Sequence, residues 1–270
     1  MLRPVQKFFE DRGTHLAAMI AYFALLSLVP LVFLALALLG LFGRVDESSY
    51  LVTELERMFP EASIEGIVRE VRRIQRNAAT LGILGAIFLA WTSLSLFSVL
   101  ESAFNIVYGR PNRGFVRGKV LAIVLVASSL VVLFAALVVG SIGVDLLEDY
   151  APGVLATRPV GYALSLLVST AGLFVFLISV YYLLTNERLT LREVLPGAVL
   201  ATVLLQVTFQ ALPAFLRTTD AILSLRALGT PVLLLVWLYL MSNVIVFGAE
   251  VNWWWARGRR ERLEETAGLA

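Results

Sequence analysis

The chain has 270 residues, of which 59% are hydrophobic and 16% are charged, and its mean hydropathy is +0.84. A soluble domain of this length exposes too much surface to be so apolar, so the composition excludes a water-soluble protein and predicts a membrane protein. The formal charge of +2 is too small to indicate a nucleic-acid partner, and the absence of cysteine excludes disulfides and thiolate metal sites.

Six long runs of the sequence contain no Asp, Glu, Lys or Arg. Each run exceeds the roughly 20 residues that a helix needs to cross a ~30 Å hydrocarbon core, and backbone groups have no water to bond within lipid. The runs predict an all-α, polytopic membrane protein that forms one domain over residues 1–270. Its six transmembrane helices are expected at about residues 15–43, 79–107, 119–144, 160–185, 194–217 and 230–256.

The orientation follows from the basic residues, because cytoplasmic loops carry an excess of Lys and Arg. Thirteen lie in the two terminal tails and in the loops after the second and fourth spans, against nine on the other side. Both termini are therefore expected in the cytoplasm. Three of the thirteen, Arg3, Lys7 and Arg12, precede the first span, which is too long for a signal-peptide core and has no A-x-A cleavage site. We expect it to be an uncleaved span.

Residues 44–78, between the first two spans, predict two short amphipathic helices outside the cytoplasm. Apolar residues follow one helical face on each side of Pro60, which ends the first helix. They are Leu51, Val52, Leu55, Met58 and Phe59, then Ile64, Ile67, Val68, Val71 and Ile74. We expect this insert to rest on the outer membrane surface or to cap the bundle.

Small residues recur at helical spacing in three spans, where they allow helix backbones to approach closely. They are Ala17, Ala21 and Ala24 in the first span, Gly161, Ser165, Ser169 and Gly172 in the fourth, and Pro196, Gly197 and Ala201 in the fifth. We interpret these stripes as packing seams.

Two carboxylates lie inside the spans, where an ionisable group is costly and is expected to face a cavity or a partner. Glu250 precedes Arg257 by seven residues and Glu101 precedes Arg110 by nine, which puts the acids roughly 10 Å and 13 Å from the same surface. Polar side chains accompany each acid on its own helix, and two amides lie in the fifth span. The candidate buried polar pocket comprises Glu101, Asn105, Asn243, Glu250, Ser98, Ser102, Gln206 and Gln210.

Two interpretations of this polar set stay open. In the functional one, Glu101, Asn105, Asn243 and Glu250 line a cytoplasm-facing vestibule. In the structural one, each acid pairs with an interfacial arginine or bonds to helix-end groups, and so locks the bundle. The single histidine, His15, lies at the start of the first span and is either a proton-sensitive group or an interfacial polar anchor.

Several stretches together resemble the YihY/BrkB family of bacterial inner-membrane proteins. "HLAAMIAYFALLSLVPLVFLALALLG" is similar to its first-span motif, "AWTSLSLFSVLESAFNIVYGRP" to its second-span signature, and "REVLPGAVLAT" to its lead into the fifth span. "LGTPVLLLVWLYLMSNVIVFGAEVN" resembles the closing motif, while "ILSLRALG" before it departs from the Tyr-Gly pair that the family more often has. The residues in register are Ala21, Tyr22, Ser27, Pro30, Asn105, Tyr108, Trp237, Tyr239, Gly248, Ala249, Glu250 and Asn252.

The resemblance implies a six-helix fold in the bacterial plasma (inner) membrane with both ends in the cytoplasm. It also brings an old ribonuclease label, a virulence-factor label, and suggestions of transport or lipid export. The residues argue against a nuclease, because the chain has one histidine, no H-E-x-x-H or paired-Asp metal site, and no large extramembrane segment. We expect no enzyme activity, no cofactor, no metal site and no nucleic-acid partner.

Two hypotheses of function remain. One is a transporter or lipid-export protein that lies in the lipid bilayer, takes a lipid or small-molecule substrate, and uses the buried polar pocket. No ATP-binding P-loop is present, so its transport would be ion-coupled, passive or driven by a partner. The other is a non-transporting membrane scaffold that supports envelope integrity. A solvated cavity at Glu101 and Glu250 favours the first hypothesis, and a closed, dry bundle favours the second.

Overall fold

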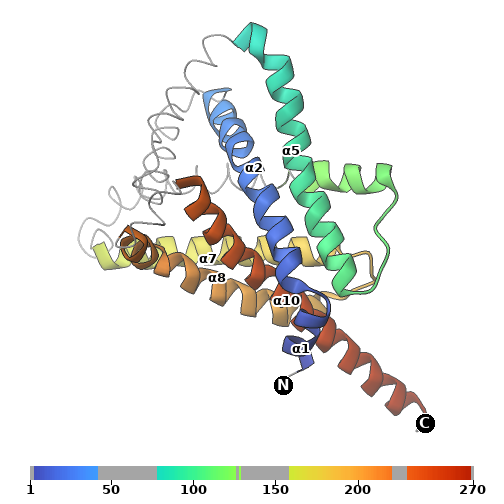
Figure 1. The fold of residues 1–270 in the computed structure, drawn as a ribbon. Coiled ribbons are helices and arrows are strands. Elements are labelled where there is room, and N and C mark those ends of the chain that lie inside the picture. The colour runs from blue at the N-terminus through green and yellow to red at the C-terminus, as the bar shows by residue number, and fades with distance from the viewer. Residues whose placement is uncertain (1–2, 42–77, 126–127, 129–157, 221–229, 269–270) are drawn as a thin grey trace, which may run out of the picture. The chain divides into compact units, whose positions relative to one another are not determined.

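The computed structural model describes residues 3–41, 78–125, 128, 158–220 and 230–268. These residues form helices joined by short loops, with no strand among them (Figure 1), which confirms the all-helical class. Residues 115–125 form a further helical segment. The named helices are α1 (Arg3–Glu10), α2 (Gly13–Leu41), α5 (Ala78–Val107), α7 (Arg158–Leu184), α8 (Leu191–Asp220) and α10 (Thr230–Gly268).

Five of these helices begin within three residues of a predicted span, namely α2, α5, α7, α8 and α10. In the described part of the chain, two stretches are long and apolar enough to cross a membrane, Leu191–Ala211 and Val232–Glu261. Shorter apolar stretches cover Gly13–Ser27, Leu94–Val107 and Ser169–Leu184. Most of the predicted third span, and the predicted insert at 44–78 up to the start of α5, lie outside the described residues.

α10 is longer than the span predicted for it, since it runs twelve residues beyond position 256 to Gly268. The added segment, "RGRRERLEETAG", consists largely of Arg, Glu and Leu, which favour helix in water as well as in lipid. Arg257 Nε also pairs with Glu261 Oε1 at 3.0 Å, one helical turn away. The helix therefore continues past the apolar stretch because its polar sequence is itself helix-forming.

The chain forms two compact units. The first comprises Met1–Leu25, Leu94–Leu125 and Leu173–Ala270, and the second comprises Leu26–Ser93 and Val126–Gly172. The described parts of the second unit are segments of α2, α5 and α7. Every residue of the candidate pocket lies in the first unit, so the site can be built within one compact body.

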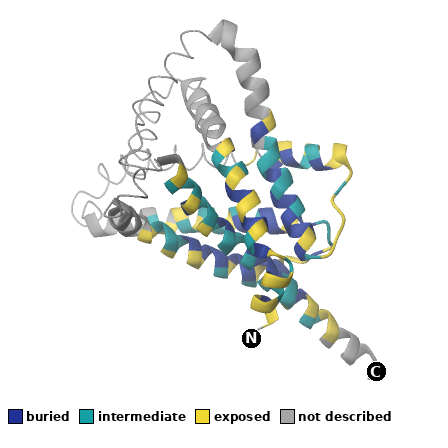
Figure 2. Ribbon diagram, in the orientation of Figure 1, coloured by how far each residue is buried: buried dark blue, intermediate teal, exposed yellow. Residues whose placement is uncertain are grey.

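The core of the first unit is centred on the packing of α8 against α10 (Figures 1 and 2). Ala198, Ala201, Val246 and Ala249 are fully buried there. Ala17 and Ala21 of α2 are buried as well, so the predicted seams of the first and fifth spans are confirmed at these positions. In α7, however, Ser169 is exposed, and a Cβ on Gly172 would meet nothing within 4 Å among the described residues. Within the described residues, therefore, no contact at Ser169 or Gly172 supports the predicted seam.

The N-terminal helix α1 has no counterpart among the predicted spans. Pro4 lies at its second position, where its missing N–H leaves no helical bond unmade. Phe8 is buried, and its ring meets the ring of Phe247 on α10 edge-on at 5.9 Å. α1 packs against α10 and is joined to α2 by a turn in which Arg12 adopts a φ of 55°. Eight residues at the start of the chain are thereby docked onto the longest helix.

Candidate functional site

Most of the long-range polar contacts of the first unit gather where α5 and α7 end and α8 begins. We call this region the polar end and define it as α1, the loops 108–114 and 185–190, and α10 from Glu250 onward. α5 stops at Val107 because the next residues form a C-cap, in which Gly109 N donates to Ile106 O at 3.0 Å with a φ of 62°. Glycine adopts this left-handed conformation without a Cβ clash, and the chain turns back into the loop.

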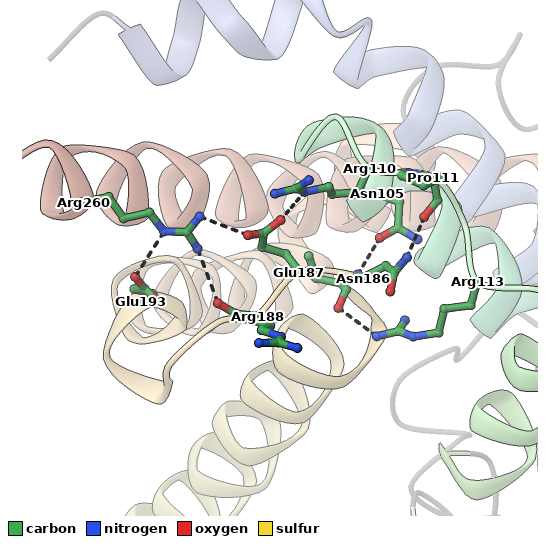
Figure 3. Close-up of polar contacts among 10 residues, drawn as sticks. Asn105, Arg110, Pro111, Arg113, Asn186, Glu187, Arg188, Glu193 and Arg260 are labelled. Carbon is green, nitrogen blue, oxygen red and sulfur yellow. Dashed lines mark hydrogen bonds and ion pairs between the residues drawn. The ribbon is translucent and has the colours of Figure 1, made fainter. Parts of the chain in front are cut away.

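Asn105 joins this loop to the loop that follows α7. Its side chain is fully buried, and its Oδ1 accepts a 2.7 Å hydrogen bond from Asn186 N. Its Nδ2 donates to Asn112 Oδ1 at 3.0 Å, and Asn112 Nδ2 donates to Ser102 Oγ at 3.1 Å. Asn186 Nδ2 in turn donates to Pro111 O at 2.9 Å (Figure 3). Because both ends of the Asn105 amide are used, the side chain fixes the position of the two loops relative to α5.

Glu101 is buried on the same helix and pairs with Arg113. Its Oε1 lies 3.3 Å from Arg113 Nη1 and accepts a hydrogen bond from Arg113 N at 3.3 Å. The same guanidinium donates to Leu184 O at 2.6 Å and to Thr185 O at 2.9 Å, which are carbonyls at the end of α7. Cations are favourable at helix C-termini, so Arg113 satisfies the helix end and the acid together.

A chain of charged residues links the second loop to α10 (Figure 3). Glu187 forms ion pairs with Arg110 and with Arg260, the latter at 3.0 Å. Arg260 Nε also lies 3.9 Å from Glu193 Oε1. Glu193 Oε2 accepts hydrogen bonds from the backbone and side chain of Thr190 at 2.7 and 2.9 Å, which forms a capping box at the start of α8.

The two arginines determine the ionisation of Glu187. Partial burial raises its pKa, but the hydrogen bonds from Arg110 and Arg260 outweigh burial and hold the pKa below its ordinary value of 4.5. Burial, with Coulomb repulsion from Glu193, raises the pKa of the nearby Tyr108 hydroxyl, which stays protonated at neutral pH. Glu187 is therefore an anion that holds two cations, and Tyr108 remains a hydrogen-bond donor beside them.

Glu250 lies on α10 with 0% of its side chain exposed, and its cation comes from α1. Lys7 Nζ lies 3.2 Å from Glu250 Oε2, donates to Val107 O at 2.8 Å, and pairs with Asp11. The ammonium also lies 4.4 Å from the ring centroid of Trp253. Within the described residues, neither oxygen of Glu250 accepts a hydrogen bond of normal geometry. The most buried acid of the polar end thus depends on one lysine of a short helix.

Beside Glu250, a backbone amide of α8 bonds a side chain of α10, and a side chain of α7 bonds a carbonyl oxygen of α10. Gly197 N donates to Asn252 Oδ1 at 2.6 Å, and Tyr181 Oη donates to Ile245 O at 2.8 Å. A Cβ on Gly197 would overlap the carbonyl oxygen of Gly248, and a Cβ on Gly248 would overlap Tyr181 Oη. The fully buried Asn252 leaves its Nδ2 without a hydrogen-bond partner in the described part of the chain. Only glycine fits at position 197, where the obstacle is backbone, whereas a Cβ at position 248 requires the Tyr181 side chain to shift.

The remaining residues of the predicted pocket lie apart from these contacts. Ser98 Oγ donates to Leu94 O and receives a 3.1 Å bond from Lys119 Nζ. Asn243 Nδ2 donates to Tyr239 O, one turn back on its own helix, at 2.7 Å. Gln206 is half-buried and Gln210 is exposed. His15 is exposed, and its Nδ1 lies 3.4 Å from Thr14 Oγ1.

The structure therefore joins Asn105 and Ser102 through Asn112, and gives Glu101 and Glu250 a separate cation each. No hydrogen bond or ion pair joins Glu101 to Glu250 directly among the described residues. In the sequence-based predictions, Lys7 and Arg113 serve only as orientation signals, and neither Asp11 nor Glu187 is a candidate site residue. The signal for Lys7 was present: apolar Val5, Phe8 and Phe9 with Lys7 and Asp11 make an amphipathic segment directly before the first span.

Two clefts open at the polar end. One, of about 300 Å³, is lined by Tyr108, Arg110, Glu187, Trp253, Arg257 and Arg260, among others. The other, of about 350 Å³, adjoins α1 and is lined by residues that include Arg3, Lys7, Asp11, Trp253, Trp254 and Arg257. Both clefts share Trp253 and Arg257, so indole surface and guanidinium groups lie together in each. Such a lining combines apolar and charged surface, as an amphiphilic ligand requires.

Comparison with known proteins points to one family. The family described as virulence factor BrkB matches residues 5–268. A protein of Bacillus subtilis, YfkH, whose name includes "ribonuclease-like", is 27% identical over 254 residues, which cover 91% of each chain. A UPF0761 membrane protein of Alteromonas mediterranea is 25% identical over 252 residues, which cover 91% of this chain and 84% of that protein.

A UPF0761 membrane protein of Chromohalobacter salexigens is 26% identical over 275 residues. The match covers 96% of this chain and 63% of that longer protein. No solved structure matches the chain.

Proposed function

The chain belongs to the virulence factor BrkB family of membrane proteins, and we propose that it is a multi-pass inner-membrane protein that moves an amphiphilic, lipid-like substrate through the polar end of its helices. The proposal includes six spans with both termini in the cytoplasm. It places the polar end at the cytoplasmic surface.

The contacts of the polar end support this topology. Arg110 lies in the loop after the second predicted span, Glu187 in the loop after the fourth, and Arg260 in the C-terminal region. Because the three side chains form one ion-pair chain, this contact favours a topology with the segments that carry them on one side of the membrane. The bond from Lys7 of the N-terminal helix to Val107 O favours the same side for that helix. These segments supply the basic residues that the positive-inside rule assigns to the cytoplasm.

The observation that carries the proposed function is the burial of Glu250. It lies within the apolar stretch Val232–Glu261, fully buried, with an ion pair to a short helix and no hydrogen bond of normal geometry. A carboxylate in such a position is costly, so its retention favours a role in a substrate or ion pathway. If a buried acid had only a structural role, hydrogen-bond donors would be expected to surround its oxygens. Glu101 is an example, because its Oε1 accepts two hydrogen bonds from Arg113.

The lining of the clefts favours an amphiphile over a small ion. Trp253 and Trp254 offer apolar ring surface at the depth where aromatic residues meet lipid headgroups. Arg257 and Lys7 lie against the Trp253 ring, with the Arg257 guanidinium carbon 5.5 Å from its centroid. The charged headgroup and the apolar chain of an amphiphile would thus both find partners in one cleft.

The experiment is lipid movement in proteoliposomes. Purified protein is reconstituted with a trace of phosphatidylethanolamine that carries a nitrobenzoxadiazole group on an acyl chain and keeps its free ammonium, and dithionite is added outside. Vesicles without protein lose about half of the total signal, which is the part that comes from the outer leaflet. We expect further loss in vesicles that contain the protein. A trace identical to that of protein-free vesicles, with reconstitution verified, rejects lipid movement.

A second candidate, a non-transporting scaffold, is favoured by the close contact of α8 and α10 at Gly197 and Gly248 and by the pairing of Glu101 with Arg113. A scaffold needs a rigid bundle and no pathway. It predicts normal envelope integrity for any variant that folds, including a neutral Glu250→Gln. The transport proposal predicts that this variant folds and fails.

The ribonuclease description belongs to the Bacillus relative, and we do not extend it to this chain. Within the described residues, no group of three His, Cys, Asp or Glu side chains is arranged to hold a metal ion. The one histidine is exposed and contacts Thr14. The proposal therefore assigns no hydrolytic step to these residues.

A further inference from the structure

The surroundings of the Lys7 ammonium have the composition of a receptor for a primary amine. A primary ammonium has three N–H donors and no acceptor. Around Lys7 Nζ lie the Glu250 carboxylate at 3.2 Å, the carbonyl oxygen of Val107 at 2.8 Å, and the Asp11 carboxylate. The indole of Trp253, with its centroid at 4.4 Å, supplies a cation–π contact.

The carboxylates around the Lys7 ammonium outnumber its single positive charge. Two carboxylates, Asp11 and Glu250, face one ammonium. Glu250 is fully buried and accepts no hydrogen bond of normal geometry in the described part of the chain. A fully buried carboxylate is costly unless a cation binds it, and the cation that binds Glu250 is Lys7. Because Lys7 pairs with Glu250 and lines the cleft beside α1, an ammonium that enters this cleft can compete for the same carboxylate.

Lys7 lies on α1, a helix that can separate from α10. α1 has eight residues, too few for a helix to be stable alone in water. It is held on α10 mainly by Phe8 and by Lys7 itself, and a turn at Arg12 with positive φ separates it from α2. The cleft of about 350 Å³ adjoins Lys7. Withdrawal of the Lys7 side chain would leave Glu250 open to a competing ammonium without any change in the α8–α10 packing.

A second cation in the cleft adds a place for an anion. Arg257 lies against the same Trp253 ring as Lys7, and its partner Glu261 is an exposed residue one turn away on the same helix. Exposed pairs of this kind are weak, so a phosphate can compete for the guanidinium. An ammonium site and a guanidinium thus flank one indole.

We propose that this site binds a ligand with a primary ammonium and a neighbouring phosphodiester, as in a phosphoethanolamine headgroup, and that Lys7 is a tethered occupant which the ligand displaces. The ammonium takes the place of Lys7 Nζ between Glu250 and Trp253, and the phosphodiester lies toward Arg257. The inference deepens the proposed function by naming the group that is recognised. Its test reads binding alone, so its failure is distinct from a failure of lipid movement.

The first experiment empties the site with Lys7→Ala in the full-length protein in detergent. This change removes three methylenes and the ammonium, which n-propylammonium replaces. We expect the lowered Tm of Lys7→Ala to rise with n-propylammonium and to stay unchanged with n-propanol. The double variant Lys7→Ala/Glu250→Gln should not respond to either. Equal responses to amine and alcohol, or a response that survives Glu250→Gln, would overturn the ammonium site.

The second experiment tests displacement in protein that keeps Lys7. The chain has no cysteine, so Gln6→Cys gives a single site for a spin label on α1. We expect sn-glycero-3-phosphoethanolamine to mobilise the label at a concentration at least about tenfold lower than sn-glycero-3-phosphocholine does, because a quaternary ammonium cannot donate hydrogen bonds to Glu250 or to Val107 O. A label that stays immobile with both compounds, or responds to both alike, refutes displacement. If Lys7→Ala does not fold, this spin-label experiment alone tests the proposed site.

Discussion

Replacement of Gly197 by alanine tests the packing on which the polar end rests. The new Cβ would overlap the Gly248 carbonyl oxygen and would lie 2.5 Å from Asn252 Oδ1. Ordinary contact needs about 3.4 Å or more, so α8 and α10 must separate by roughly 1.5 Å, and the 2.6 Å bond from Gly197 N to Asn252 Oδ1 is lost. The change therefore adds bulk and removes a buried hydrogen bond at the same point.

The magnitude follows from these two effects. Overpacking of a close contact costs about 1–3 kcal/mol, and leaving the buried Asn252 carbonyl unpaired costs about 1–3 kcal/mol more. The higher helix propensity of alanine returns about 1 kcal/mol. We expect a net loss of about 1–5 kcal/mol, which lowers the Tm in detergent by roughly 3–15 °C for a chain of this size.

Gly258→Ala in α10 is the matched control, because a Cβ there would meet nothing within 4 Å. It gains the same helix propensity without a clash, so its Tm should be unchanged or slightly raised. Thermal unfolding of both variants in one detergent is the assay. If Gly197→Ala unfolds within about 2 °C of Gly258→Ala, the close contact of α8 and α10 is refuted.

Three further outcomes are expected. The depressed pKa of Glu187 means that its contribution to stability is present above pH 4.5 and is lost as the pH falls below that value. The Tm should therefore drop below pH 4.5, and the drop should be smaller in Glu187→Gln. A cysteine at Ser63, which lies outside the described residues, should react with an impermeant maleimide in intact cells, whereas reaction only after permeabilisation overturns the topology. Purified protein should cleave no RNA, and cleavage that disappears in His15→Ala would prove this wrong.

The helical fold was largely predictable from the sequence because its main signal is physical and long-ranged. A run of about 20 uncharged residues has few alternatives to a helix in lipid, so the starts of α2, α5, α7, α8 and α10 fell close to the predicted spans. The extension of α10 to Gly268 was not predicted, because hydropathy measures the apolar stretch and not the polar helix that continues it. α1 was missed for the same reason.

The sequence predicts both acids of the candidate site and, in one of its two interpretations, an arginine partner for Glu101, but it does not predict the lysine that pairs with Glu250. Glu101 and Glu250 are identified by the rarity of charges within apolar runs, and the arginine partner expected for Glu101 is present as Arg113. The partner of Glu250 is Lys7, more than 240 positions away, and no spacing rule relates them. Such a pair is fixed by the docking of α1 on α10, which is a tertiary event.

Asn252 shows a different limit. The sequence resemblance singled it out, but only the approach of Gly197 to Gly248 reveals that its side chain bonds a backbone amide of another helix. The fit depends on an approach of two helices that leaves no room for a Cβ at Gly197, to which composition and periodicity are insensitive.

The most direct test of the account measures lipid movement and Tm together for Glu250→Gln, with Gly197→Ala as a variant that is destabilised but keeps the acid. If Glu250 serves the substrate pathway, Glu250→Gln should lower the rate per folded protein by at least about tenfold, which corresponds to about 1.4 kcal/mol. Gly197→Ala should lower the Tm and keep the rate per folded protein. A Glu250→Gln protein that moves lipid at the wild-type rate, or loses rate only in proportion to its Tm as Gly197→Ala does, would contradict the account and leave Glu250 a structural partner of Lys7.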